Sequence, residues 1–393
     1  MTSNAQQWNA LTPDLLRSRG SNKWTAPDGE LLCAGVAEMD FGTAPAVLAE
    51  WASITERLDF GYPTESVARE LSEATAAWHL EHYGWAVDAA DISPIADVLK
   101  GLELAILEFS APGAPVIVPT PAYMPFLLLP RVLGRDVIES PMLRGDDGSF
   151  ALDLDDIAKH FADGANLVVL ANPGNPTGKV YTAEELSALA DVADTHAARV
   201  FSDEIHAPLV LFGNRHVPLA SISDAGARVA ITATSTSKAF NLPGLKCSQL
   251  ILSNDADRER WAEIGMFVSH GASTPGMRMN TAAYLHGTEW LDEVREYIEG
   301  NITWMREALA QQLPEARMAP VQGTYLVWLD LRAYSDEAEL AELLAEKAGI
   351  RVNGGIGYGE VGAGHIRVNV ATSRSILERI VSQLASAMSL PRL

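Results

Sequence analysis

The stretch Val229-Ala-Ile-Thr-Ala-Thr-Ser-Thr-Ser-Lys238 gives the first indication of the fold class, because a short apolar run leads directly into hydroxyl side chains and a single lysine. The apolar residues predict a buried strand over Val229–Ala233. A lysine that follows such a strand, in a stretch without other charges, can lose part of its hydration. Its pKa then falls, and the neutral amine can form a Schiff base. Taken alone, the pattern marks a solvent-exposed loop lysine more often than a reactive one, so other segments must support it.

Two other polar segments directly follow predicted strands: Ser202-Asp-Glu-Ile-His206 and Asn172-Pro-Gly-Asn-Pro-Thr-Gly178. Prolines and glycines make the second segment a rigid loop that offers an asparagine amide as a well-placed donor. Open α/β folds bind their ligands at the carboxyl ends of such strands. The side chains expected at this edge of the sheet are Asp203, His206, Asn175 and Lys238.

Around these segments, short apolar runs alternate with amphipathic helical stretches, which is typical of βαβ units around a mostly parallel sheet. Thr182 and Glu185 have the spacing of a capping box and predict the start of a helix. The fold class is therefore α/β. The predicted buried strands are Ala114–Pro119, Asn166–Ala171, Arg199–Asp203, Val229–Ala233 and Gln249–Ser253.

The pattern divides the chain into three predicted parts. Residues 1–43, rich in Pro, Gly and Ser, are expected to form an irregular N-terminal arm that joins the small domain. Residues 44–285 carry the βαβ pattern of a large domain, and residues 286–393 predict a smaller α+β domain. The elements expected in the small domain are the helices Trp290–Leu313 and Glu337–Ala348 and the strands Tyr325–Leu329 and Gly364–Ala371.

The strand Gly364–Ala371 carries one arginine among apolar residues. Strand alternation puts Arg367 on the face opposite Ile366 and Val368. An arginine in that position is either a surface residue or a bidentate clamp for a carboxylate.

Composition limits the possible functions. The chain of 393 residues has 29 Lys and Arg against 51 Asp and Glu, a net charge of −22, which disfavours binding to nucleic acid or to an anionic membrane surface. Cys33 and Cys247 are too few for a disulfide framework or a four-cysteine zinc site. His79 and His82 have helical ligand spacing but no third ligand nearby, which favours a solvated helix face, and no metal is expected.

The N-terminus lacks the pattern of a secretory signal, and no apolar run of 18 residues occurs. We therefore expect a soluble, cytoplasmic protein.

The ordered set Asn-Pro-x-Asn-Pro-Thr-Gly, Ser-Asp-Glu-Ile-His, Ser-x-Ser-Lys and Arg-Val-Asn-x-Ala resembles the fold-type I pyridoxal-phosphate enzymes of the class I/II aminotransferase superfamily. Within that superfamily the chain is similar to the MalY/PatB subgroup of cystathionine β-lyases, which are cysteine-S-conjugate C–S lyases. The resemblance implies a large domain with a mostly parallel seven-stranded sheet and a smaller α+β C-terminal domain. Segments that also look like this subgroup are Lys23-Trp24, Val36–Phe41, Phe60–Tyr62 and Pro121–Phe126.

The resemblance implies a role for each matching residue around the cofactor ring. Lys238 would form the Schiff base with pyridoxal 5′-phosphate and move the Cα proton of the substrate, and Asp203 would keep the pyridine nitrogen protonated. Tyr123 would stack on the ring and complete the catalytic set. Asn175 would bind the ring 3′-oxygen, and His206 stands where many aminotransferases have a tyrosine.

The resemblance also implies the residues that hold the cofactor phosphate. Ser235, Ser237 and Lys246 would bind it, and the lysine stands where the family often has an arginine. The backbone N–H groups of Val98 and Leu99, at a predicted helix N-terminus, would add donors.

Tyr62 matches a family tyrosine that reaches the phosphate bound by the neighbouring subunit. The resemblance therefore implies a homodimer with shared active sites.

Substrate binding would fall to Arg367, as a clamp for the α-carboxylate, together with Asn175 and Tyr123. The implied reaction is β-elimination from cystathionine or a related cysteine S-conjugate, which yields pyruvate, ammonia and a thiol. One alternative is an aminotransferase, which would use all of these residues. Another is a regulatory protein that keeps the lyase fold to bind a partner. The sequence leaves the natural leaving group open.

Overall fold

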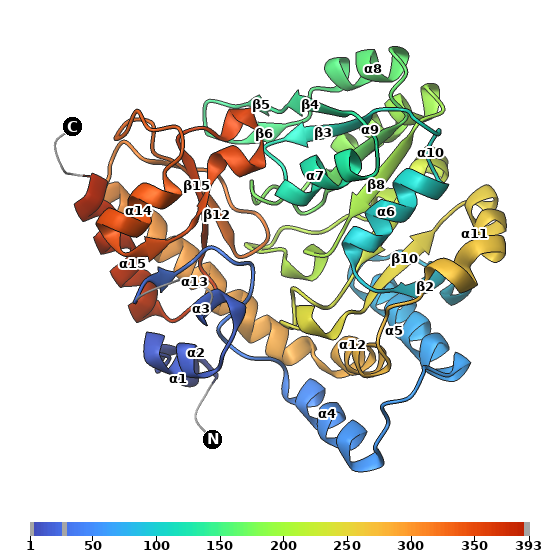
Figure 1. Ribbon diagram of the computed structural model, residues 1–393, viewed down its shortest axis with the longest axis horizontal. Coiled ribbons are helices and arrows are strands. Elements are labelled where there is room, and N and C mark those ends of the chain that lie inside the picture. The colour runs from blue at the N-terminus through green and yellow to red at the C-terminus, as the bar shows by residue number, and fades with distance from the viewer. Residues whose placement is uncertain (1–3, 26–29, 389–393) are drawn as a thin grey trace.

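A seven-stranded sheet, in the order β2-β10-β9-β8-β7-β3-β4, lies at the centre of the computed structural model, which describes residues 4–25 and 30–388 (Figure 1). Strands β9, β8, β7, β3 and β4 are parallel, whereas β10 is antiparallel to both β9 and β2. The predicted mostly parallel sheet is confirmed. The strands are β2 (Ile92–Ile95), β3 (Val116–Thr120), β4 (Val137–Pro141), β7 (Leu167–Ala171), β8 (Arg199–Asp203), β9 (Ala230–Thr234) and β10 (Ser248–Leu252).

Alternate residues of the central strands face two separate hydrophobic cores. On β7, Leu167 and Val169 belong to the core under α6 and α7, while Val168 and Leu170 belong to the core under α8, α9 and α10. Burial on both faces explains why β7 is a continuous apolar run in the sequence. The covering helices are α6 (Val98–Glu108), α7 (Met124–Val132), α8 (Leu154–Ala162), α9 (Ala183–Thr195) and α10 (Asp224–Val229).

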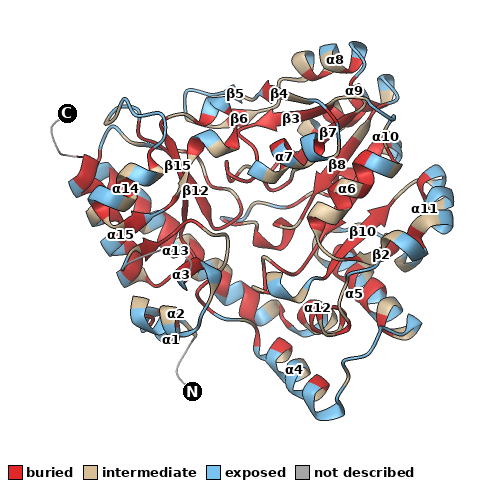
Figure 2. Ribbon diagram, viewed as in Figure 1, coloured by how far each residue is buried: buried red, intermediate tan, exposed pale blue. Residues whose placement is uncertain are grey.

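The predicted capping box is present, since the Thr182 side chain accepts from the Glu185 backbone N–H and the glutamate side chain accepts in return. Figure 2 shows the sheet almost wholly buried and the outer faces of the covering helices exposed.

Helix α6 packs closely against the sheet at Gly101, which has no side chain. A Cβ added at Gly101 would lie 3.1 Å from the Cβ of Ala233 and 3.3 Å from the ring of Phe201. A larger residue would push the helix outward, which would also move its N-terminus away from the edge of the sheet.

The C-terminal part contains a second, antiparallel sheet in the order β11-β12-β15-β14. Its strands are β11 (Arg317–Met318), β12 (Leu326–Asp330), β14 (Asn353–Gly354) and β15 (His365–Asn369). The elements packed around it include α13 (Thr288–Gln312), α14 (Ala341–Ala348), α15 (Arg374–Met388) and the short strand β13 (Ile350–Arg351). The α+β prediction for this part is confirmed, although the boundary at residue 286 stays a prediction.

The remaining elements lie at the periphery of the large part. They are α4 (Pro45–Arg57), α5 (Glu65–Tyr83), α11 (Asp255–Val268), α12 (Thr274–His286) and the hairpin of β5 (Leu143–Arg144) and β6 (Phe150–Ala151).

The N-terminal arm is helical, so the prediction of an irregular arm is wrong. It forms α1 (Asn4–Asn9), α2 (Pro13–Ser18), α3 (Asn22–Thr25) and β1 (Leu32–Cys33). The Thr12 side chain caps α2 and Pro13 occupies its first turn, a start signal that the overall Pro, Gly and Ser content obscured. Residues 1–3 and 26–29 of the predicted arm, and 389–393 of the predicted small domain, lie outside the described residues.

A buried ion pair joins two segments of the arm. Lys23 Nζ lies 3.0 Å from Asp40 Oδ2, both side chains are almost fully buried, and Trp24 Nε1 donates to the other carboxylate oxygen at 2.8 Å. Strand β1 pairs in parallel with β13, which joins the arm to the C-terminal part.

The sequence predicts that His79 and His82 of α5 lie on a solvated helix face, and this prediction is wrong. His79 is buried, and its Nδ1 lies 2.8 Å from the carbonyl oxygen of Thr75. In the described part of the chain, no three His, Cys, Asp or Glu side chains are arranged to hold a metal ion. Among the helices of residues 4–25 and 30–388, none combines the length and apolarity needed to cross a bilayer.

Candidate active site

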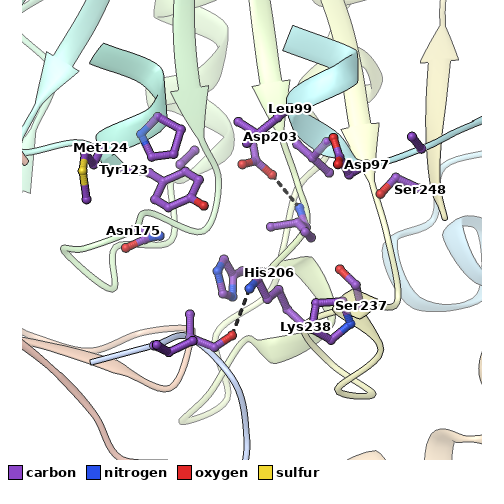
Figure 3. Close-up of a pocket in the computed structure, with 18 of the residues that line it drawn as sticks. Asp97, Leu99, Tyr123, Met124, Asn175, Asp203, His206, Ser237, Lys238 and Ser248 are labelled. Carbon is purple, nitrogen blue, oxygen red and sulfur yellow. Dashed lines mark hydrogen bonds between the residues drawn. The ribbon is translucent and has the colours of Figure 1, made fainter. Parts of the chain in front are cut away.

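A cavity of about 400 Å³ lies where β2, β3, β7, β8 and β9 end and β10 begins. The antiparallel direction of β10 brings its first residues to the same edge as the carboxyl ends of the others. In Figure 3, Tyr123 and Asn175 lie on one side of the cavity, Ser237 and Ser248 on the other, and Lys238 below. The predicted site residues that line it are Lys238, Asp203, Tyr123, Asn175, His206, Ser237, Lys246, Val98, Leu99 and Arg367.

Lys238 reaches the cavity four residues after β9 ends. Its Nζ donates a hydrogen bond of 2.9 Å to the backbone oxygen of Ala37, and the hydroxyl of Tyr325 donates to the same oxygen at 2.9 Å. Burial and the positive charge of Arg367 lower the pKa of the Lys238 amine to about 8. A neutral, nucleophilic amine is therefore accessible close to neutral pH.

Asp203 is the last residue of β8 and is a buried residue of the cavity wall. Burial raises the pKa of its carboxyl group to about 7, although the Ile205 N–H donates to it at 3.0 Å and Lys238 favours its ionised form. A cation placed against this carboxyl group would stabilise the carboxylate and lower that pKa. Burial and the negative charge of Asp203 also raise the pKa of the Tyr123 hydroxyl.

His206 presents an unsatisfied nitrogen in the same region. Its ring is buried, and burial together with the charges of Lys238 and Arg367 lowers its pKa well below the ordinary value, so the imidazole is neutral. Its Nδ1 has no hydrogen-bond partner within the described residues. A buried polar atom of this kind is normally paired, which makes it a contact point for a bound polar group.

Arg367 and Asn175 are joined by a hydrogen bond in the wall of the cavity. Arg367 is only 3% exposed; its Nη1 donates to the Asn175 Oδ1 at 3.0 Å and its Nη2 to the Gly35 backbone oxygen at 2.6 Å. Its guanidinium lies 5.2 Å from the centre of the Tyr358 ring. These contacts fix the guanidinium plane, as bidentate binding of a carboxylate requires.

The far end of the cavity gathers donors suited to a phosphate. Asp97 caps α6 by accepting from the Lys100 N–H at 2.9 Å, which leaves the N–H groups of Val98 and Leu99 in the first turn. Lys246 Nζ lies 2.7 Å from Asp97 Oδ2, so the lysine shares its charge with the capping carboxylate.

Two predicted residues lie outside the cavity. Ser235 is fully buried; its Oγ donates to the Cys247 backbone oxygen at 2.8 Å and accepts from the Ser237 N–H at 3.1 Å. The hydroxyl thus supports the turn that carries Ser237 and does not line the cavity. Tyr62 is 96% exposed and is absent from the cavity of its own chain.

Sequence reasoning missed Ala37, Ser248, Asn353 and Tyr325. Ala37 contributes a backbone oxygen, which no residue type signals, and Ser248 begins a strand whose direction the pattern did not give. The sequence pattern predicts that Tyr325 begins a strand, but it gives the residue no role in the site. A tyrosine at the start of an otherwise apolar buried strand was the one available signal.

The residues present fit pyridoxal phosphate. A buried carboxyl group with a raised pKa suits a pyridinium nitrogen, and the unpartnered His206 Nδ1 and the Asn175 amide suit a ring oxygen. A helix N-terminus with Ser237 and Lys246 suits a phosphate. The Lys238 amine has the reactivity that an aldehyde requires.

Comparison with known proteins agrees with the predicted family. Residues 30–384 match the family described as aminotransferase class I and II. A cystathionine β-lyase of Corynebacterium glutamicum is 36% identical over 375 residues, which cover 95% of this chain and 98% of that protein. Cystathionine β-lyase PatB of Bacillus subtilis is 34% identical over 360 residues, covering 90% and 92%.

Comparison with a solved structure supports the predicted fold type. The pyridoxal-phosphate-bound C–S lyase of Staphylococcus hominis superposes with a TM-score of 0.87 at 27% identity, covering 95% of this chain and 97% of that one. The predicted fold type is confirmed. The chain therefore belongs to the aminotransferase class I and II family of pyridoxal-phosphate-dependent enzymes, and it stands with the cystathionine β-lyases of that family.

Proposed function

We propose that the protein is a pyridoxal-phosphate-dependent carbon–sulfur β-lyase that cleaves cystathionine or related cysteine S-conjugates to pyruvate, ammonia and a thiol. One observation carries the proposal: an amine of lowered pKa, a buried carboxyl group and an oriented guanidinium converge on one cavity. The relatives named as cystathionine β-lyases support elimination as the reaction.

The cofactor, when bound, supplies a protonated ring that withdraws electrons from the substrate Cα. Asp203 would hold the proton on the ring nitrogen, because a carboxylate beside that nitrogen favours its charged form. His206 and Asn175 would bind the ring oxygen. Ser237 and the first turn of α6 would bind the phosphate.

Arg367 binds the α-carboxylate of the substrate and so places its Cα beside Lys238. The neutral Lys238 amine accepts the Cα proton, and the backbone oxygen of Ala37 is positioned to accept a hydrogen bond from the resulting ammonium group. The arm thus holds the proton-carrying group in place between the two halves of the reaction.

The electrons released from the Cα–H bond form a Cα–Cβ double bond as the Cβ–S bond breaks. The sulfur leaves with the bonding pair and takes up a proton, which the Lys238 ammonium group can return. Water then converts the released aminoacrylate to pyruvate and ammonia, so atoms and electrons balance without an oxidant.

The experiment is a product balance with cystathionine and S-alkylcysteines, with and without 2-oxoglutarate. A lyase forms pyruvate, ammonia and thiol in equal amounts, and 2-oxoglutarate changes the rate little. An aminotransferase would stop after one turnover until the keto acid was added. No turnover of any conjugate by the cofactor-loaded protein would favour a regulatory role and overturn the proposal.

We also propose that the enzyme is a homodimer whose active sites are shared. In Figure 1, α4 and the loop after it stand away from the sheet, and this segment exposes Leu58, Phe60 and Tyr62. The loop is nevertheless held in place, since Thr274 Oγ1 donates to the Gly61 backbone oxygen at 2.7 Å. An ordered loop with exposed aromatic rings is typical of a protein interface.

Mixing an inactive Lys238→Ala chain with a Tyr62→Phe chain tests the shared site. A mixed dimer should contain one site free of both changes and recover activity that neither parent has. Mixtures with only the summed activity of the parents, or a fully active monomer at high dilution, would contradict the proposal.

A further inference from the structure

A second cavity of about 430 Å³ adjoins the active site at the seam between the arm, α7 and the C-terminal part. The two cavities share Val36, Met124 and Asn353 in their walls. Asn353 is the direct strand partner of Arg367, so the second cavity begins beside the residue proposed to bind the substrate carboxylate.

Charged side chains of both signs line this cavity: Lys23, Arg351, Glu339 and Glu342. Lys23 is not available to a ligand, because its Nζ donates to Asp40 at 3.0 Å and to the Glu38 backbone oxygen at 3.3 Å. Arg351, which ends β13, forms no ion pair within the described residues. It is therefore the cation that the cavity offers to an anionic group.

The two glutamates come from the segment that begins α14. Glu339 Oε1 accepts from the Ala341 N–H at 2.8 Å, and the carboxylate lies so close to Gly354 that a Cβ there would be 1.7 Å from Oε1. The absence of a side chain at Gly354 thus admits a carboxylate to the wall beside Asn353. Glu342 lies one residue beyond Ala341 and lines the same cavity.

We propose that this second cavity is a subsite for the far end of the leaving group and that it favours thioethers whose thiol part carries a second amino-acid group. Arg351 binds the distal carboxylate, and Glu342 with Glu339 binds the distal ammonium group. The proposal rests on the lyase function proposed above, and it adds the residues that select among cysteine conjugates. An uncharged alkyl chain would meet the same walls without pairing either charge.

The first experiment compares cystathionine with S-butylcysteine, whose thiol part is uncharged. In the holoenzyme, Arg351→Ala should raise KM for cystathionine about fivefold, the effect of one solvent-exposed ion pair, and change KM for S-butylcysteine less than twofold. The matched control is Lys347→Ala, which removes the same charge from an exposed position of α14 outside the cavity. It should leave both KM values unchanged.

The second experiment separates the two distal charges. Glu342→Gln should raise KM for cystathionine but not for S-(3-carboxypropyl)cysteine, which keeps the distal carboxylate and lacks the ammonium group. Arg351→Ala should raise KM for both of these substrates. Glu346→Gln, an exposed change of equal charge on α14, serves as the control.

The outcomes distinguish the subsite from the activity itself. Equal KM changes for charged and uncharged conjugates, or no change in Arg351→Ala, would overturn the subsite while pyruvate formation upheld the lyase. No pyruvate from either conjugate would overturn the lyase and the subsite together.

Discussion

The two walls of the active-site cavity are built in different ways. On the sheet side, Asp203 ends a parallel strand, and Asn175 and Lys238 each follow the end of one; two hydrophobic cores fix the positions of these strands. On the arm side, the wall is backbone: Arg367 donates to Gly35, and Asn369 Nδ2 donates to the carbonyl oxygens of Val36 and Glu38, at 2.6 to 2.8 Å.

The sheet side therefore carries the reactive groups, whereas the arm side determines the shape of the site. Reactive groups need fixed positions and shifted pKa values, and buried strand ends supply both. The arm supplies carbonyl oxygens, each held by one or two side chains at about 1 kcal/mol per hydrogen bond. Changes on the sheet side should therefore abolish catalysis, whereas single changes on the arm side should weaken it.

The largest effect is expected on the sheet side. Lys238→Ala should lower pyruvate formation at least about a thousandfold, because the group proposed to move the Cα proton is lost. The control is Lys179→Ala, which removes a lysine that pairs with Glu185 at 2.7 Å outside the cavity. Borohydride reduction of the loaded enzyme and peptide mapping should place the adduct on Lys238. An adduct on Lys179 or Lys246 would show that the reactive amine is elsewhere.

An intermediate effect concerns Asp203 in the cofactor-free protein. Its folded pKa of about 7 lies above its ordinary value of 3.8, so the folded state binds the proton more tightly than the unfolded chain does. The stability that this provides is complete below pH 3.8 and is lost as pH rises through 7. Asp203→Asn should therefore raise the melting temperature at pH 8 by roughly 5 °C, and the gain should shrink toward pH 5.

Thermal unfolding of the cofactor-free proteins at both pH values measures this effect. Asp136→Asn, at an exposed position, should show no such dependence on pH. A variant less stable than the wild type at pH 8 would mean that the Asp203 carboxylate is paired even without the cofactor.

The smallest effect is expected on the arm side. Tyr325→Phe removes one of the two hydrogen bonds to the Ala37 oxygen and should lower kcat about fivefold, with little change in KM. Steady-state kinetics on S-butylcysteine would measure it, with Tyr334→Phe as the control. A loss as large as that of Lys238→Ala would abolish the distinction between the two walls.

The sheet side was largely predictable from sequence. The strand Arg199–Asp203 was predicted with its observed bounds: four of its five residues are buried, and Val200 and Phe201 pack into the cores on opposite faces of the sheet. Strand β4 was missed, since most of its residues are only partly buried and it ends in a proline at the edge of the sheet. The predicted roles of the site residues remain predictions.

The arm side was much less predictable. Its carbonyl oxygens accept hydrogen bonds from side chains that are hundreds of residues away in the sequence. No sequence motif in either partner predicts the contact. The spacing of Ser235 and Ser237 did not show which hydroxyl faces the cavity. That depends on the tertiary contact of Ser235 with Cys247.

The pairing of the arm with the C-terminal part determines when a newly made chain can complete its active site. Gly35 and Arg367 are 332 residues apart, which a ribosome covers in roughly 15 to 70 seconds. During that interval the sheet can fold and present Lys238 and Asp203, while the Gly35 backbone oxygen lacks its Arg367 partner. The pairing of Gly35 with Arg367 is thus a late step of assembly, and a truncated nascent chain holds the reactive groups without the arm-side wall of the cavity.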